Sequence, residues 1–304
     1  RVGVAPEAGG RVVSLALRGR PNILKADATL LKHGRHVRRT RVTPRSHFVP
    51  YNGHIVWLGP QRQWWADQHV HERRRRRRVI WPPDPFLVKA TFDVASVTPE
   101  RITMVGPPSP VSGVQLTKHI SIARDGTVTF RASARNTRRR PVAWDLWFNT
   151  RLDGHARCYV PVAGHADIHM SVSARRRSGV MPWQLTDGCF TFAPRPPSAG
   201  QKNRNAKAFL YPAAGRIAAF RSRQMLLLQF PRHPRRAIHP KQALVEIFNT
   251  TTHDRGGALL ELEYHAPFVT LAPGESMHAT QRWNLYAYDG GSKPGEQLRF
   301  LSKV

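Results

Sequence analysis

Carboxylates are scarce in this sequence, and one of them lies between two tryptophans. Asp145 stands in the stretch N-T-R-R-R-P-V-A-W-D-L-W-F-N-T-R-L, residues 136–152, which is predicted to contain a β-strand. Alternate residues of a strand share a face. One face then carries Asp145, Trp147, Asn149 and Arg151, whereas Trp144 points into the core. Because a flat apolar ring beside hydrogen-bonding groups suits the C–H face of a sugar, we predict that this face forms one wall of a saccharide-type cleft.

Three further carboxylates lie inside apolar, strand-like segments: Glu246 in V-E-I-F-N, and Glu261 and Glu263 in L-E-L-E. A buried carboxylate acquires a partner or becomes protonated, and both states can serve acid–base catalysis. The alternative role is a salt bridge with one of the many arginines, and the shared face of Glu261 and Glu263 favours it. Glu246 is alone in its strand and is therefore the preferred catalytic candidate.

Histidines offer a second set of candidates. His54 follows the turn at residues 52–53 and leads towards Trp57, so it is either a site residue or a residue that stabilises the turn. The motif H-A-D-I-H, residues 165–169, has spacing that could hold Zn²⁺ with a fourth ligand, but chance explains it better in a chain with 15 histidines. The sequence has no glycine-rich phosphate loop, nucleophile elbow or cysteine-rich zinc motif. We predict no metal and no cofactor.

Tryptophans supply the apolar side of the proposed cleft. Six of the eight lie in two clusters with polar neighbours, and the full set is Trp57, Trp64, Trp65, Trp81, Trp144, Trp147, Trp183 and Trp283. Their ring faces suit sugars, and they suit stacked nucleic-acid bases nearly as well. Burial in the core of a sandwich is the alternative for any one of them.

The charge of the chain points to anionic partners. It has 48 Lys+Arg against 19 Asp+Glu, a formal net charge of +29, and such a surface attracts polyanions. Nucleic acid, anionic polysaccharide, lipopolysaccharide and an acidic membrane surface are all admissible, although codon bias of a GC-rich genome is an alternative cause. The cations are spread over the whole chain, which argues against a dedicated nucleic-acid surface. The run Arg73–Arg78 is predicted to be a solvated loop, because six adjacent like charges repel one another.

Many short strands separated by Gly, Pro and Asp turns, with no long amphipathic helix, predict an all-β sandwich. No composition shift marks a boundary, so residues 1–304 are predicted to form one domain. Strands are predicted in residues 11–24 (an opening pair), 86–95, 101–105, 114–123, 127–135, within 136–152 (the strand of Trp144 and Trp147), 156–173 (a pair), 180–193 (a pair), 208–212, 215–220, 224–230, 243–249, 258–264, 267–271 and 276–288, with loops at His33–Arg45 and 194–207.

The location of the protein is inferred from what the sequence lacks. No apolar run approaches the roughly 20 residues that span a bilayer. The first residue is Arg1, and we expect a mature periplasmic or secreted chain from which an export signal has been removed. Cys158 and Cys189 form either a disulfide or two reduced thiols.

Taken in order, several segments carry a resemblance to a known family. They are G-G-R-V at 9–12, P-N-I-L at 21–24, G-H-I-V-W at 53–57 with P-Q at 60–61, W-P-P-D at 81–84, L-T-K at 116–118, W-F-N-T at 147–150, V-E-I-F at 245–248, L-E-L-E at 260–263, L-A-P-G-E at 271–275 and W-N-L at 283–285. In this conjunction the chain resembles bacterial proteins of domain of unknown function 4380. That family is similar to the galactose mutarotase-like β-supersandwich, which implies an antiparallel all-β fold with a carbohydrate cleft on the concave face of a large sheet.

The resemblance also assigns roles to residues. Mutarotases pair a glutamate base with a histidine acid, and Glu246 occupies a place like that of the glutamate. The counterpart of the histidine falls on Asp145, so the acid would be Asp145 or His54. Substrate-binding candidates within the resembling segments are Trp57, Gln61, Trp81 and Lys118, in addition to Trp147, Asn149 and Arg151.

Three functions are compatible with these residues. The first is an exported carbohydrate-binding protein for an acidic glycan, held by tryptophan stacking and by arginine forks that match carboxylate geometry. The second is a sugar epimerase or other carbohydrate-active enzyme with Glu246 as base. The third is a polyanion binder of nucleic acid or envelope lipid that depends on charge alone.

Overall fold

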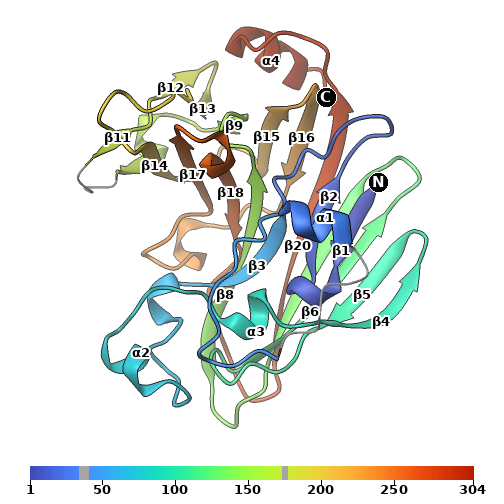
Figure 1. Ribbon diagram of the computed structural model, residues 1–304, viewed down its shortest axis with the longest axis vertical. Helices are drawn as coiled ribbons and strands as arrows, with labels where there is room; N and C mark the ends of the chain where they lie inside the picture. The colour runs from blue at the N-terminus through green and yellow to red at the C-terminus, as the bar shows by residue number, and fades with distance from the viewer. Residues whose placement is uncertain (34–40, 173–176) are drawn as a thin grey trace.

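The chain forms two large β-sheets that pack face to face (Figure 1). The computed structural model describes residues 1–33, 41–172 and 177–304. The helices are short: α1 (Ala28–His33), α2 (Glu72–Arg76), α3 (Pro85–Val88) and α4 (Pro294–Leu301), with single 3₁₀ turns at Pro6–Ala8, Gln61–Gln63, His165–Asp167, Arg235–Ala237 and Arg255–Gly257. The predicted all-β class is confirmed.

The first sheet carries most of the predicted site residues. In spatial order its strands are β1 (Val2–Ala5), β2 (Arg11–Leu15), β3 (His54–Gly59), β8 (Val142–Leu152), β18 (Leu259–His265), β17 (Val245–Thr252), β14 (Asn203–Leu210) and β10 (Ile168–Ser171). All these neighbours are antiparallel. Two short strands join at the side, β11 (Ser178–Val180) in parallel with β14 and β19 (Val269–Leu271) with β8.

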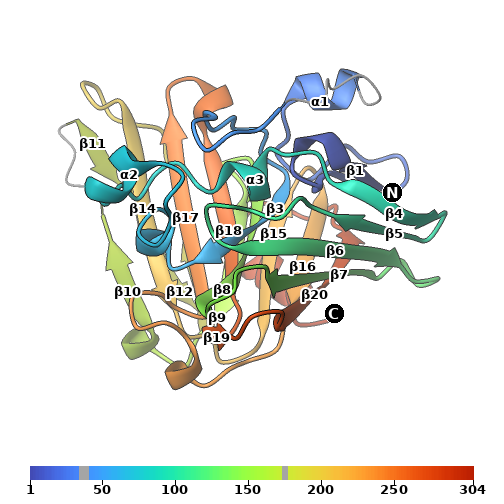
Figure 2. The ribbon, with the colours of Figure 1, turned by 90° about the horizontal axis from the view of Figure 1, so that it is seen from below.

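The second sheet is a long antiparallel array. Its order is β12 (Trp183–Thr186), β13 (Cys189–Phe192), β9 (Arg157–Pro161), β15 (Arg216–Arg221), β16 (Gln224–Gln229), β20 (Ser276–Ala287), β7 (Val128–Asn136), β6 (Val114–Ile122), β5 (Arg101–Val105) and β4 (Asp93–Thr98). In Figure 2 the strands β5, β6 and β7 run across the direction of β14, β17 and β18. Helix α4 covers the outer face of this sheet, where Leu298 packs with Tyr159 and Phe220.

Strand alternation decides which side chains enter the core. Along β6 and β7 every second residue is buried, as expected for sheets with one face against a core. The space between the sheets is filled from both sides, for example by Phe148 of the first sheet against Phe130 of the second. Trp144 is 5 % exposed and lies in this core, as predicted. Cys158 and Cys189 are both buried and unpaired.

The arginine run departs from prediction, because it begins within a helix. Glu72 opens α2 and pairs with Arg75 at 2.8 Å and Arg76 at 2.7 Å, three and four residues ahead. Such pairs offset the repulsion among like charges on a helix. The ring of His71 caps the helix by accepting a hydrogen bond from the backbone N–H of Arg74. Most of these side chains are nevertheless solvated, as expected.

Four other predicted elements need correction. The predicted loop at 194–207 ends in the first five residues of β14, which begins at Asn203. Residues 11–24 contain one strand, β2, whose partner β1 precedes it. Residues 86–95 divide between α3 and the start of β4. The predicted pair within 156–173 is β9 and β10, which belong to different sheets. Within the predicted loop His33–Arg45, residues 34–40 lie outside the described part of the chain. Among the described helices, none is long and apolar enough to cross a membrane.

Candidate functional site

The face of the first sheet that points away from the second sheet, here called the site face, carries a row of polar side chains. Strand β8 places Asp145, Trp147, Asn149 and Arg151 on it. The neighbouring strand β18 adds Glu261, Glu263 and His265, because each lies directly opposite a β8 residue of that set. Strand β17 contributes Glu246, opposite Glu263. The predicted face of β8 is therefore the face on which the other polar groups gather.

These groups form a continuous chain of contacts, here called the site network (Asp145, His265, Glu246, Lys207, Glu263 and Asn149). His265 lies between two carboxylates, with Nδ1 3.2 Å from Asp145 Oδ1 and Nε2 3.4 Å from Glu246 Oε1. Lys207 Nζ is 2.6 Å from Glu246 Oε2 and 2.8 Å from Glu263 Oε2. Asn149 Nδ2 then donates to Glu263 Oε1 at 2.9 Å. Apart from Lys207, whose side chain is partly exposed, these groups are buried.

Burial and pairing shift the protonation of the network in opposite directions. Burial alone would lower the pKa of His265, but the charges of Glu246 and Asp145 outweigh it and raise that pKa. Burial opposes the ionisation of Glu246, yet Lys207 and His265 hold its pKa below the usual value. In Glu263 burial dominates and raises the pKa to about 8 despite Lys207. The network therefore favours a charged His265, an ionised Glu246 and a protonated Glu263 near neutral pH.

Gln242 closes the network on its solvent side. Its Nε2 lies 3.0 Å from His265 Nδ1, and both Gln242 and Asp145 fill the space where Gly59 has no side chain. Among the described residues, several buried polar atoms around this point lack a hydrogen-bond partner, namely Asp145 Oδ2, Gln242 Oε1, Trp57 Nε1 and Trp147 Nε1. Unsatisfied buried polar atoms are rare in folded proteins, and their concentration here marks the region as the best candidate site.

The network also contains a potential set of metal ligands. Glu246, Glu263 and His265 present ligand atoms within 4.8 Å of one another. The ammonium of Lys207, however, already lies between the two carboxylates and supplies the positive charge that a cation would bring. The residues present therefore do not fit a resident metal. Asp167 of the H-A-D-I-H motif pairs instead with Arg235 at 2.6 Å.

Next to the network, four tryptophans pack against one another. Trp57 meets Trp147 edge to face at a centroid distance of 4.8 Å, and Trp64 stacks on Trp147 at 5.9 Å. Trp57 and Trp147 are only 4 % and 3 % exposed, so their rings are not free to stack on a ligand. Trp81 is 47 % exposed at the edge of the cluster, and nearby Gln61 donates to the backbone oxygen of Ile80. Arg151 lies over Trp57 and pairs with Glu261 at 2.7 Å.

A cavity of about 490 Å³ lies at the other end of the site face, over β14 and β10. Its lining residues are Ala166, Asp167, His169, Ser171, Phe209, Tyr211, Arg235, Pro240, Lys241, Gln242 and Ala243. It adjoins the network because Phe209 lies opposite Glu246 in the β14–β17 pair, and Gln242 borders both. The accessible aromatic side chains of this cavity are thus Phe209 and Tyr211, not the predicted tryptophans.

Over residues 1–286 the sequence matches the family described as Domain of unknown function (DUF4380). The chain belongs to this family. None of the curated proteins compared matches it.

Solved structures show which fold this DUF4380 chain adopts. An Escherichia coli K12 protein provisionally named an aldose 1-epimerase is 14% identical with a TM-score of 0.53, covering 94% of this chain and 95% of that one. A TPR-domain containing protein from Parabacteroides distasonis gives 15% identity and 0.54, over 96% of this chain and 47% of that one. A Synechocystis sp. PCC 6803 protein gives 13% and 0.50, over 94% and 92%. The predicted galactose mutarotase-like (aldose epimerase-like) fold is confirmed.

Two predicted site residues of the DUF4380 chain lie elsewhere. His54 and Lys118 are both 0 % exposed between the two sheets, near Arg11, and these three residues are here called the basic core cluster. His54 contacts Thr150 Oγ1 at 2.8 Å and lies beside the ring of Trp283. Lys118 Nζ donates to the backbone oxygen of Gly9 at 2.6 Å. This corrects their predicted place in the cleft, since neither reaches the site face.

The site also contains residues that the sequence reading overlooked. His265 lies on the site face in the neighbouring strand β18, whereas the resemblance led us to expect a histidine on the strand of Asp145; Asp145 contacts it. Strand alternation in L-E-L-E-Y-H could have predicted the position of His265, because it puts Glu261, Glu263 and His265 on one face. Lys207, Gln242 and Phe209 had no comparable local signal, because long-range strand pairing brings them to the site.

Proposed function

We propose that this DUF4380 protein binds a carbohydrate in the cavity over β14 and β10. The observation that carries the proposal is the position of this cavity, directly beside the Glu246–His265 pair on the site face. Its volume of about 490 Å³ lies within the range of roughly 300–1,000 Å³ of small-molecule sites. The mutarotase-like fold supports a carbohydrate as the class of ligand.

The lining of the cavity favours an acidic sugar. Phe209 and Tyr211 offer apolar ring surface, and His169 adds a hydrogen-bonding group. Arg235 and Lys241 bring two cations, of which Arg235 lies over the ring of Tyr211 at 3.8 Å and is held by Asp167. A guanidinium matches a carboxylate with two parallel hydrogen bonds. The expected ligand is therefore a uronic acid or a glycan that contains one.

The contacts within the network favour binding over reaction. Glu246 and His265 touch each other at 3.4 Å and are 2 % and 0 % exposed. A base and an acid that act on one sugar need the sugar between them, within hydrogen-bond reach of both. Here Glu246 Oε1 and His265 Nε2 contact each other directly, and Gln242 covers the other ring nitrogen of His265. We infer that Glu246 and His265 have a structural role next to the binding cavity and do not react with the sugar.

Calorimetric titration with galacturonate, glucuronate, galactose and glucose at constant ionic strength tests this proposal. We expect the uronates to bind saturably and more tightly than the neutral sugars. Phe209→Ala should weaken all binding and Arg235→Ala should weaken uronate binding by about tenfold, the loss of one charge-assisted contact.

The matched control is Arg236→Ala, which removes a neighbouring exposed arginine that does not line the cavity. It should leave the affinity unchanged. The proposal fails if no sugar binds, or if Phe209→Ala and Arg235→Ala bind uronates as the wild type does.

An epimerase is the second candidate, and the Glu246–His265 contact is the observation that favours it. If Gln242 moved aside, Glu246 could take the proton of the anomeric hydroxyl while the charged His265 donated one to the ring oxygen. Polarimetry of freshly dissolved α-galactose would then show faster mutarotation with wild type than with Glu246→Gln or His265→Asn. Equal rates for all three proteins, no faster than buffer, would exclude this activity.

Export and charge-driven polyanion binding are separate proposals that rest on composition. The net charge of +29 supports the second, and it predicts that binding to a uronate polymer weakens as salt rises. If such binding disappears completely with salt and Phe209→Ala has no effect on it, charge alone explains the affinity. Fractionation of the source cells tests export.

A further inference from the structure

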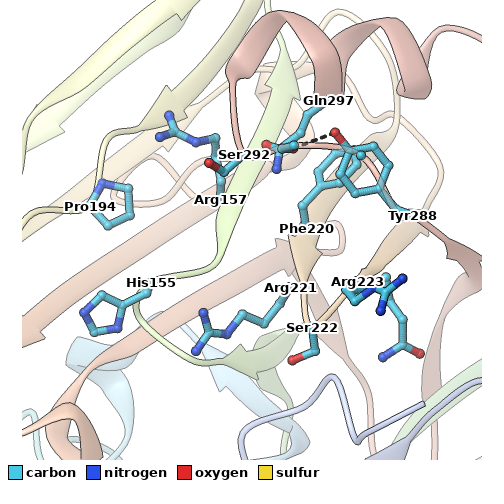
Figure 3. A pocket seen from close by; sticks show the side chains of 13 residues that line it. His155, Arg157, Pro194, Phe220, Arg221, Ser222, Arg223, Tyr288, Ser292 and Gln297 are labelled. Carbon is cyan, nitrogen blue, oxygen red and sulfur yellow. Dashed lines mark hydrogen bonds between the residues drawn. The ribbon is translucent and has the colours of Figure 1, made fainter. Parts of the chain in front are cut away.

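A second cavity, of about 280 Å³, lies on the second sheet, where the β15–β16 hairpin meets the segment that leads into α4 (Figure 3). Three arginines line it: Arg157 of β9, and Arg221 and Arg223 at the hairpin turn. Figure 3 shows Arg157 on one side of the cavity and Arg221 and Arg223 on the opposite side, where His155 also lies. None of these groups belongs to the site network or to the cavity over β14 and β10.

The strand pairing explains how the arginines reach this place. Arg157 lies directly opposite Phe220 in the β9–β15 pair, so Arg157 and Arg221 come from adjacent strands. The chain then turns in two residues, since Arg221 pairs with Gln224. Both turn residues, Ser222 and Arg223, have positive φ values of 53° and 58°. Asn and Gly are the residues that usually occupy such a turn, so Ser222 and Arg223 adopt a backbone conformation that their residue types disfavour.

The carboxylates near the cavity leave positive charge uncompensated. Asp289 is shared by Arg223 at 2.6 Å and Arg20 at 3.0 Å. Asp153 is shared by Arg221 at 3.3 Å and His155 at 3.0 Å. The carboxylate of Glu296, in the first turn of α4, lies against Gly291, which lines the cavity.

Arg157 is the arginine without an acidic partner. Within the described residues it makes no ion pair, whereas the other two lining arginines are each oriented by an aspartate. An oriented guanidinium loses less conformational freedom when it binds an anion. The cavity thus combines two pre-oriented cationic groups with one that is free to pair.

We propose that this cavity binds a phosphate group, free or as the monoester of a small molecule. Arginine recognises phosphate through charge-assisted, two-point hydrogen bonds. Cationic groups on opposite sides suit the several oxygens of a tetrahedral dianion, whereas one planar carboxylate is satisfied by a single fork. Ser222, from the same turn, adds a hydroxyl-bearing residue to the lining.

Titration with inorganic phosphate, followed by ³¹P NMR and calorimetry at constant ionic strength with chloride as the balancing anion, tests the proposal. We expect saturable binding to wild type. Arg157→Ala and Arg223→Ala should each weaken it about tenfold, the equivalent of one lost charge-assisted contact. Arg223 is largely exposed, so its variant tests the site even if Arg157→Ala disturbs the fold.

Two controls separate this site from the general charge and from the sugar cavity. Arg131→Ala removes an exposed arginine from β7 of the same sheet, and Arg235→Ala alters the other cavity; neither should change phosphate affinity. Unsaturable binding, or affinity that is equal in wild type, Arg157→Ala and Arg223→Ala, would overturn the proposal.

Comparison of probes identifies the source of the phosphate. Glucose 6-phosphate that binds like inorganic phosphate indicates a site for the free anion, and tighter binding indicates a monoester; glucose alone should not bind here. Competition by sulfate fits the same oxyanion site. If malonate displaces phosphate at equal concentration, the site is one for carboxylates and the proposal fails.

Discussion

The site network and the basic core cluster both bury cationic side chains, and they stabilise them in different ways. In the site network, Lys207 and His265 each contact two carboxylates. In the basic core cluster, the hydrogen bonds that Arg11 and Lys118 donate within the described residues go to backbone carbonyls, and each cation also lies over an aromatic ring. Arg11 donates to the carbonyls of residues 8, 52 and 88 at 2.6 Å each. Opposite charges hold the first group together, and backbone dipoles hold the second.

This difference shows in the protonation of the two groups. Burial and the charge of Arg151 lower the pKa of Arg11 to about 9, still above neutral, so the guanidinium keeps its charge. Burial first, and then the charge of Arg11, depress the pKa of Lys118. In the network, by contrast, the carboxylates overcome burial and raise the pKa of Lys207 and His265. A paired network can keep charge beside a ligand cavity, whereas the basic core cluster ties loops to strands.

Lys207→Met should give the largest loss of stability. It leaves Glu246 and Glu263 buried without their shared cation, and breaking a buried ion pair by removing one partner costs about 3–5 kcal/mol. Urea unfolding measures this free energy. Lys241→Met, an exposed lysine at the rim of the cavity, is the control and should change stability little. A loss of stability no larger than that of the control would mean that Lys207 does not stabilise the buried carboxylates of the network.

Arg11→Met should have a smaller but clear effect. It removes the donor from three carbonyls that come from distant parts of the chain, but it leaves no opposite charge unpaired. We expect a loss of about 2–3 kcal/mol, the cost of buried acceptors without partners, in the same unfolding experiment. Arg18→Met, an exposed arginine just after the same strand, provides the comparison. If Arg11→Met costs as much as Lys207→Met, the distinction between the two groups is lost.

Alternation along strands predicted much of this arrangement. It separated Trp144 from Asp145, Trp147, Asn149 and Arg151, and the register of β8 follows that division. The same rule would have corrected one error, because His54 and Trp57 are three residues apart and so point to opposite faces of β3. It would also have placed Lys118 on the buried face of β6, together with Leu116 and Ile120.

Other features could not be read from local sequence. Lys207 reaches Glu246 because β14 pairs with β17, strands separated by the β15–β16 hairpin. Gln242 comes from a loop whose segment gave no structural signal beyond Pro240. The burial of Trp57 and Trp147 depends on Trp64, which a short turn after β3 folds back onto them. Sequence patterns fix faces within a strand, but pairing between distant strands and loops decides which groups meet.

Glu263→Gln tests the protonation of the site network through the pH dependence of the free energy of unfolding. Burial raises the pKa of Glu263 from 4.5 to about 8, so between these values the folded chain holds a proton that the unfolded chain has lost. This group therefore makes wild-type stability fall as pH rises through that window, by about 1 kcal/mol per pH unit. The glutamine variant keeps the neutral form, and the difference between the two proteins should grow in its favour from pH 5 to 8. An unchanged difference would show that Glu263 is ionised in the folded chain.

Lys118→Met should have the smallest effect at neutral pH and the opposite pH dependence. The variant loses the amine that donates to Gly9, but it also avoids the cost of burying an amine that has no carboxylate beside it, so we expect a change under about 1 kcal/mol at pH 7. Because the pKa of Lys118 is depressed from 10.5, the unfolded chain binds a proton that the folded chain does not, and wild-type stability rises relative to the variant as pH increases towards 10.5. Unfolding of both proteins from pH 7 to 9.5 measures this slope. A slope of the same sign as that of Glu263 would mean that the basic core cluster, like the site network, contains a compensating acid.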